Sequence, residues 1–96
     1  MTTKQRAYLR SLAQTTDPIT QIGKDGVTEA FLDGVDKAIE KRELVKISVL
    51  QTSPVFAKEA SVEIAEAIGA TVVQVIGNRI VLYRKNEKKP KIVLPR

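Results

Sequence analysis

The residues of this chain with the clearest potential for chemistry form the run Gly23-Lys24-Asp25-Gly26. The run separates a short apolar stretch from an amphipathic one, so we expect it to be a loop between a strand and a helix. Glycine allows positive φ and close approach of another backbone, and a helix begins with unpaired N–H groups and a positive dipole end. With the charge of Lys24, this arrangement is suited to holding a phosphate group.

A tight turn that needs two flexible residues explains the same pattern equally well, because Gly-x-x-Gly fixes only two positions. The run lacks the spacing of a P-loop, and it is not a dinucleotide-binding fingerprint. The KH domain of RNA-binding proteins also holds nucleotide backbone with a GxxG loop, but that loop joins two helices. The pattern therefore indicates the chemistry of such a loop and not the KH fold.

The composition argues against catalysis, because the 96 residues include no cysteine and no histidine. A thiol nucleophile, a zinc finger and a disulfide framework are excluded, and the commonest general base and metal ligand is absent. We therefore expect no enzymatic activity, no catalytic or metal-binding residues and no cofactor. No apolar run approaches the roughly 18 residues of a membrane span, and the N-terminus has no secretory h-region. These features predict a cytoplasmic protein without a membrane partner.

The net charge of +5 is concentrated in the two terminal segments. Residues 1–24 carry a net +3 and residues 76–96 a net +6, whereas residues 25–45 carry −3 and residues 46–75 carry −1. If the fold brings the ends together, they form a cationic patch. This distribution favours a polyanionic partner such as a nucleic acid.

Hydrophobic periodicity and turn residues predict one domain over residues 1–96, with residues 85–96 as a basic and flexible tail. Thr2 and Gln5 have the spacing of a capping box, and Asp25 or Thr28 is suited to cap the second helix. We expect an α/β two-layer sandwich with an N-terminal helix, then β-α-β-α-β-β and a four-stranded mixed sheet. The predicted helices span 2–14, 27–42 and 56–68, and the predicted strands span 19–22, 44–50, 72–76 and 80–83, the last two forming a hairpin.

The aromatic side chains are predicted to serve the core more than a binding surface. Tyr8 shares a helical stripe with Leu12, so core packing is favoured over stacking on a base, and Phe31 and Phe56 are both expected in the core. Tyr83 keeps both interpretations open. Lys46 is expected to be solvated, Arg79 lies at the expected hairpin tip, and the acidic residues of the second helix are expected to form a solvated face that pairs with neighbouring lysines and arginines.

Four stretches together resemble a known family. They are Lys-Gln-Arg-Ala-Tyr-Leu-Arg at 4–10, Ile-Gly-Lys-Asp-Gly-Val-Thr at 22–28, Glu-Leu-Val-Lys at 43–46 and Val-Gln-Val-Ile-Gly…Leu-Tyr-Arg across 73–84. In this order and spacing they resemble the bacterial stand-alone CRM-domain proteins (chloroplast RNA splicing and ribosome maturation), the YhbY-like family. Arg42 departs from the family pattern, in which histidine commonly precedes the Glu-Leu motif.

The resemblance implies a fold like the C-terminal domain of translation initiation factor 3. It also implies RNA binding and association with precursors of the large ribosomal subunit. The family's RNA-contact elements are its GxxG loop and the neighbouring basic surface. Carried onto this chain, the implied RNA-binding residues are Gly23, Lys24, Asp25, Gly26, Lys4, Arg6, Arg10, Thr28 and Arg84.

The combined expectation is a monomeric, non-enzymatic RNA-binding protein of the cytoplasm that binds ribosomal RNA or pre-ribosomal particles and no small-molecule substrate. One alternative is a protein–protein adaptor on ribosomal particles, whose basic surface contacts acidic proteins. A second alternative is an enzyme that uses the loop for a phosphorylated ligand, which the missing catalytic residue types disfavour.

Overall fold

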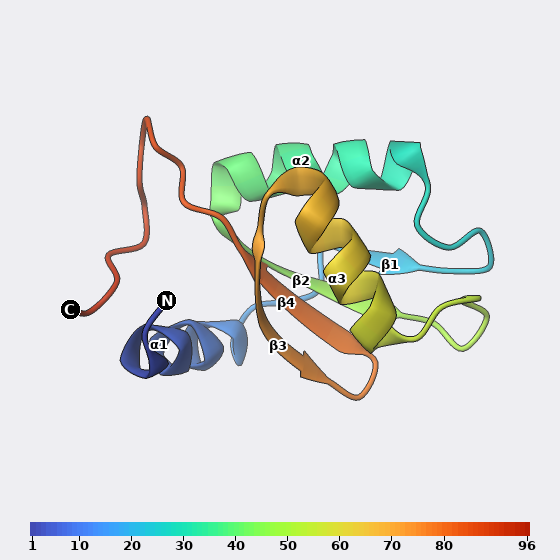
Figure 1. The fold of residues 1–96 in the computed structure, drawn as a ribbon, viewed down its shortest axis with the longest axis horizontal. Coiled ribbons are helices and arrows are strands. Elements are labelled where there is room, and N and C mark those ends of the chain that lie inside the picture. The colour runs from blue at the N-terminus through green and yellow to red at the C-terminus, as the bar shows by residue number, and fades with distance from the viewer.

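The chain folds into three helices and a four-stranded sheet (Figure 1). The computed structural model describes all residues, 1–96. In chain order the elements are α1 (Thr3–Ala13), β1 (Thr20–Ile22), α2 (Glu29–Arg42), β2 (Leu44–Val49), α3 (Ala57–Ile68), β3 (Thr71–Ile76) and β4 (Arg79–Tyr83).

The sheet is mixed, with the strand order β1-β2-β4-β3. The edge strand β1 pairs in parallel with β2, and Gln21 lies opposite Ser48. β4 lies between β2 and β3 and is antiparallel to both. The predicted α/β fold and its four-stranded mixed sheet are therefore confirmed, including the final hairpin, whose turn is Gly77-Asn78.

One face of the sheet is covered by α2 and α3 (Figure 1). Alternate residues of β2, among them Val45 and Ile47, point into this layer and are fully buried. They pack against Val35 and Ile39 of α2 and against Ile64 of α3. These helices follow the spacing that the sequence predicts, so the main core forms from the expected stripes.

The opposite face of the sheet is partly covered by α1 and by the C-terminal segment. Leu9 and Ala13 of α1 pack against Leu44, Val73 and Val81, and Ile92 and Leu94 complete this second core. Part of the molecule is thus three layers thick. For this reason both faces of β2 are buried except at Lys46, which the sequence predicts to be solvated and which is half-buried.

α1 is fixed at its start and along its side. The predicted capping box is present, because Gln5 N donates to Thr2 Oγ1 (3.0 Å) and Thr2 N donates to Gln5 Oε1 (3.1 Å). Arg6 Nη1 donates to the carbonyl oxygens of Val72 (2.6 Å) and Val73 (3.1 Å). These carbonyls lie at a register shift in the edge strand β3, so Arg6 satisfies acceptors that the bulge takes out of the ladder.

Two aromatic predictions are wrong. Tyr8 is 39% exposed, since the turn of α1 that faces the sheet is filled by Leu9 and Leu12. Phe56 is 81% exposed, because it precedes α3 in an extended conformation (φ −78°, ψ 158°) and leaves the helical stripe. Tyr83 is buried. Its burial is the largest cause of the raised pKa of its phenol, and the negative charges of Glu43 and Glu87 raise this pKa further.

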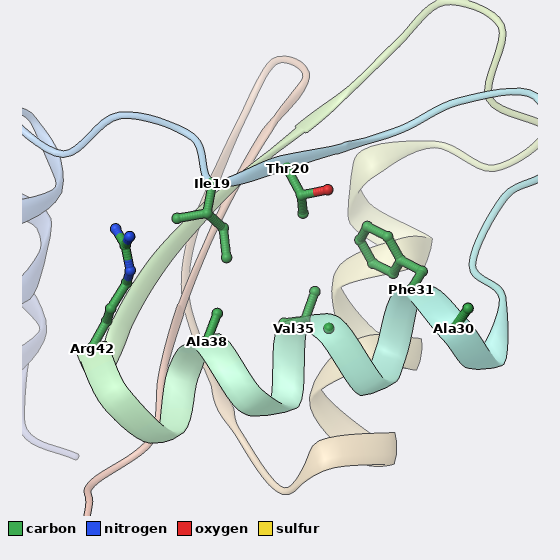
Figure 2. A pocket seen from close by; sticks show the side chains of 8 residues that line it. Ile19, Thr20, Ala30, Phe31, Val35, Ala38 and Arg42 are labelled. Atoms are coloured by element: carbon green, nitrogen blue, oxygen red, sulfur yellow. The ribbon is translucent and has the colours of Figure 1, made fainter.

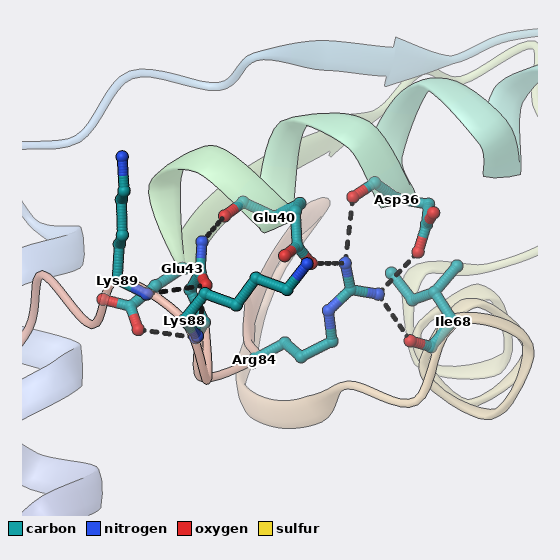
Figure 3. A network of polar contacts seen from close by, with 8 residues as sticks. Asp36, Glu40, Glu43, Ile68, Arg84, Lys88 and Lys89 are labelled. Atoms are coloured by element: carbon teal, nitrogen blue, oxygen red, sulfur yellow. Dashed lines mark hydrogen bonds and ion pairs between the residues drawn. The ribbon is translucent and has the colours of Figure 1, made fainter.

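The C-terminal segment after β4 follows a defined path back toward α1 (Figure 1). Glu43 Oε2 accepts from Asn86 N (2.7 Å), and Glu43 Oε1 accepts from Lys91 N (2.6 Å) and Ile92 N (2.7 Å). Asn86 in turn donates through Nδ2 to Glu40 O (2.7 Å) and accepts from the backbone of Lys88 and Lys89 (Figure 3). The flexible tail that the sequence suggests is thus tied to the end of α2.

Candidate nucleic-acid interface

The run Gly23–Gly26 forms a tight turn between β1 and α2. Gly26 N donates to Gly23 O (3.0 Å), and Gly26 has a φ of +69°, which L-residues with a side chain rarely adopt. Lys24 and Asp25 lie exposed at the tip of the turn. The two glycines therefore have different roles, since only Gly26 needs its conformational freedom.

The helix α2 begins at Glu29, three residues after Gly26. Thr28 is its N-cap, and Thr28 Oγ1 accepts from Phe31 N (3.0 Å). Of the two capping residues expected, Thr28 is thus the one used, and its hydroxyl is engaged in the cap. Because Val27 and Thr28 separate the turn from the helix, and because Glu29 already provides a negative charge to the dipole, the cationic group best placed for phosphate is Lys24.

The Gly23–Gly26 turn packs against the loop between β2 and α3, which spans residues 50–56. A Cβ added at Gly26 would lie 3.1 Å from Pro54 Cγ, and one added at Gly23 would lie 3.8 Å from Leu50 Cδ1 and 3.9 Å from Thr52 Oγ1. The two loops lie at the same end of the molecule (Figure 1). We call this the loop end, defined by residues 23–28, residues 50–58 and the Gly77-Asn78 turn.

The basic residues of α1 do not neighbour the GxxG turn. Figure 1 shows α1 at one end of the long axis and the β1–α2 loop at the other, and the molecule measures 39 Å along that axis. Lys4 is exposed and Arg10 is half-buried, and neither forms an ion pair. The guanidinium of Arg6 is engaged by the carbonyls of β3, so this side chain supports the fold.

Arg84 is also engaged within the protein (Figure 3). Its Nη1 donates to Asp36 Oδ1 (2.5 Å) and to Ile68 O (2.7 Å), while Nη2 donates to Glu40 Oε2 (3.0 Å) and Asp36 O (3.1 Å). The side chain of Arg84 is 19% exposed. Its contacts join the end of β4 to α2 and to the end of α3, and they neutralise two carboxylates of the acidic helix.

The cations of the loop end form no ion pair with a carboxylate. The three ion pairs of the structure use Lys37 and Arg84 only, so Lys24 and Lys58 carry unpaired charges. Lys58 lies in the first turn of α3, and no feature of the sequence distinguishes it from the other lysines. Lys46 and Arg79 line a small hollow of about 180 Å³ beside the end of α1, and no acidic side chain lines it.

The terminal segments do come together, which is the condition under which the sequence predicts a cationic patch. Ile92 and Leu94 pack against the core that α1 forms with the sheet, and both chain ends lie on the same side of the molecule (Figure 1). The exposed lysines at 85, 88, 89 and 91 are therefore on a segment that is held beside α1. The chain thus has two cationic regions, this terminal one and the smaller loop end.

A hollow of about 400 Å³ lies between β1 and α2 (Figure 2). It is open because α2 presents Ala30, Gly34 and Ala38 toward Ile19 of the edge strand, and a Cβ at Gly34 would meet nothing within 4 Å. Arg42, the departure from the family pattern, is the one charged residue that lines it. With a mostly apolar lining and a single cation, this hollow contains no cluster of positive charges.

Two further findings concern the chemistry of the surface. No group of three or more acidic side chains is placed to hold a metal ion. None of the three helices is both long enough and apolar enough to cross a membrane.

The four-stranded mixed sheet, its three helices and the glycine-flanked turn between β1 and α2 define a CRM-type domain. The model of the CRS1/YhbY (CRM) domain family matches residues 1–84. The chain belongs to this family. The match covers every helix and strand, and the C-terminal segment held by Glu43 follows it.

Related proteins agree with this assignment over the full length. The chain is 38% identical over 95 residues to YqeI of Bacillus subtilis, named a probable RNA-binding protein, with 99% of each chain covered. It is 34% identical over 96 residues to an RNA-binding protein of Haemophilus influenzae, covering 100% of this chain and 96% of the relative. A solution structure of a candidate RNA-binding protein from Staphylococcus aureus superimposes with a TM-score of 0.82 at 45% identity, covering 99% of both chains.

Proposed function

We propose that this protein binds RNA, and that its target is ribosomal RNA in precursors of the large ribosomal subunit. The family and the names of the relatives support RNA binding. The observation that carries the proposal is the exposed Lys24 at the tip of the Gly23–Gly26 turn, which forms no ion pair within the protein. The ribosomal target rests on the family resemblance that the four stretches between residues 4 and 84 carry together.

In this proposal the RNA backbone lies across the loop end. Lys24 supplies counter-charge to one phosphate, and the peptide groups of the exposed turn lie against the RNA backbone. Lys58, Lys46 and Arg79 extend the unpaired charge away from the turn. Neutralising about four phosphates of a single strand gives a slope near −3 for log K against log salt concentration.

The terminal lysines contribute a second, less specific attraction. Lys4 and Arg10 of α1 and the lysines of the C-terminal segment lie away from the GxxG turn (Figure 1). Their charge raises the association rate and the overall affinity for any polyanion. The protein acts as a monomer in the cytoplasm without cofactor or small-molecule substrate, and it performs no reaction on the RNA.

Crosslinking in living cells with ultraviolet light, followed by sequencing of the attached RNA, tests the target. The proposal expects reads concentrated on large-subunit ribosomal RNA and crosslinked peptides from the loop end. Reads spread evenly over all cellular RNA contradict the ribosomal target.

Treatment with RNase separates RNA binding from the role of a protein adaptor. Sedimentation of the protein with pre-ribosomal particles is expected to be lost once the accessible RNA is digested. Retention on particles after digestion contradicts the proposal and favours protein contacts.

A further inference from the structure

The loop end contains a groove that the sequence did not suggest. It has a volume of about 640 Å³ and lies between the β2–α3 loop and the β3–β4 turn. This volume is within the range of small-ligand sites. No acidic side chain is among the residues that form it, which are Val49, Leu50, Gln51, Ser53, Val55, Phe56, Ala57, Lys58, Val75, Gly77 and Asn78.

Phe56 gives this groove an aromatic wall. The residue is 81% exposed, whereas the other phenylalanine, Phe31, packs against the core. Leu50, in the same loop, is 38% exposed. A solvent-facing phenyl ring beside an apolar groove on an otherwise well-packed domain is suited to receive a flat, partly apolar partner.

The loop that carries Phe56 is internally braced. Ser53 Oγ donates to Val55 O (2.8 Å) and accepts from Val55 N (3.2 Å), and Ser53 N donates to Leu50 O (3.0 Å). Asn78 O accepts from Val49 N (2.7 Å), which joins the β3–β4 turn to the end of β2. Both walls of the groove are therefore positioned before any partner arrives, which lowers the entropy cost of binding.

The groove is continuous with the GxxG turn. A Cβ added at Gly26 would lie nearest to Pro54, two residues before Phe56, and a Cβ added at Gly23 would lie nearest to Leu50, which lines the groove. An RNA strand with one phosphate at Lys24 would run along the β2–α3 loop. Lys58 adds an unpaired cation at the groove.

We propose that this groove holds an unpaired nucleobase stacked on Phe56, next to the phosphate at the Gly23–Gly26 turn. This inference rests on the proposed RNA binding and adds to it a preference for single-stranded RNA. A base offers the aromatic face that matches Phe56, and its polar edge would meet the side-chain amides of Gln51 and Asn78. Such a pocket would allow a chain with few aromatic residues to distinguish an unpaired strand from a duplex.

The sequence contains no tryptophan, so Phe56→Trp introduces a single tryptophan, whose fluorescence reports on the proposed contact. Titration with a single-stranded oligouridine is expected to quench this fluorescence and to leave affinity at the wild-type level or higher. The matched control is Val62→Trp, at a position of α3 that is 50% exposed and outside the groove. Quenching in the control equal to that of Phe56→Trp overturns the proposal.

The second arm is Phe56→Ala, measured by fluorescence anisotropy with the single strand and with a paired RNA duplex. Because stacking on an aromatic residue is typically worth about tenfold or more in affinity, we expect about a tenfold loss for the single strand and little change for the duplex. The slope against salt should not change, since no phosphate contact is removed. The high exposure of Phe56 makes unfolding of this variant unexpected, and circular dichroism checks it.

The possible outcomes keep the two proposals apart. Unchanged affinity of Phe56→Ala, together with a weakened Gly23→Asp variant, overturns the base pocket and leaves RNA binding at the turn intact. Failure of the wild-type protein to bind RNA removes the proposed function itself. If Phe56→Ala changes only self-association in sedimentation, the groove is a contact between copies of the chain, and the base pocket is wrong.

Discussion

Glu43 Oε1 accepts a hydrogen bond from the backbone N–H of Ile92 at 2.7 Å, although the two residues are 49 positions apart in the sequence. Glu43 is fully buried and has a φ of +64°, which places it in the left-handed region at the end of α2. This conformation is costly for a residue other than glycine. It directs the carboxylate at three backbone N–H groups of the C-terminal segment. These hydrogen bonds hold the lysine-rich segment in a fixed position beside α1.

Glu43→Gln is expected to release this segment. An amide at this place turns an NH₂ group toward a backbone N–H donor, so at least one buried hydrogen bond is lost, and the free energy of unfolding should fall by about 2–3 kcal/mol. Urea denaturation measures the loss, and hydrogen exchange should show faster exchange at Lys91 and Ile92. The control is Glu66→Gln, an exposed change on α3. Unchanged protection of the two amides contradicts this role of Glu43.

The same contact predicts a dependence on acid pH. Burial by itself would raise the pKa of the Glu43 carboxyl, but the backbone N–H groups of Asn86, Ile92 and Lys91 and the charge of Lys91 lower it below its ordinary value of 4.5. A lowered folded-state pKa means that the stabilisation is complete above pH 4.5 and is lost as the pH falls through the folded value. The difference in unfolding free energy between wild type and Glu43→Gln should therefore shrink on acidification below that pH. If the difference in unfolding free energy stayed constant from neutral pH to pH 3, the ionised carboxylate of Glu43 would not be the source of the stabilisation.

Arg84→Gln tests whether this arginine serves the fold or the RNA. The substitution removes donors to Asp36, Glu40 and Ile68 O, and we expect a loss of about 1–3 kcal/mol in the free energy of unfolding. RNA affinity of the folded variant should stay within about twofold of wild type. Lys85→Gln, at the next and exposed position, is the control for loss of charge. A large fall in RNA affinity with normal stability would place Arg84 in the binding surface after all.

Arg6→Gln is expected to weaken the attachment of α1 to the sheet. Loss of the donors to Val72 O and Val73 O should cost about 1–2 kcal/mol, and amides of β3 should exchange faster because its bulge is then uncovered. Arg10→Gln, on the same helix, should leave stability near wild type because Arg10 makes no ion pair. Equal stability of the two variants would contradict the supporting role of Arg6.

The sequence predicts the elements of this fold well because their signals are local. The capping box of Thr2 and Gln5, the stop at Gly69 (φ +69°) and the hairpin turn at Gly77 are each formed as their residue types require. The buried stripes of α2 and β2 follow simple periodicities. Such features depend on neighbours within a few residues, which a single sequence displays directly.

The candidate site is less predictable because it depends on how distant segments meet. A count of charges treats Lys24 and Arg6 alike, yet Arg6 lies at the far end of the molecule and is held by carbonyls of a bulge in β3. Phe56 fits the stripe of α3 in the sequence, but the helix begins one residue later and leaves the ring in solvent. In the sequence Glu43 likewise cannot be distinguished from the exposed acidic residues of the second helix. In the structure it is buried because the C-terminal segment packs over it.

The central claim, that RNA lies against the Gly23–Gly26 turn, is tested most directly at Gly23. A side chain there meets only Leu50 and Thr52 at ordinary distances, whereas a substitution at Gly26 is strained by its positive φ and by Pro54. Gly23→Ala and Gly23→Asp are therefore both expected to fold, which circular dichroism verifies, and they differ chiefly by one negative charge beside Lys24.

Filter binding with a single-stranded fragment of large-subunit ribosomal RNA then measures the affinities of wild type and both variants. The proposed function predicts that Gly23→Ala binds within about threefold of wild type and that Gly23→Asp binds at least about tenfold more weakly, with a shallower dependence on salt. Equal affinities and equal salt slopes for wild type, Gly23→Ala and Gly23→Asp would contradict the claim that the turn holds RNA.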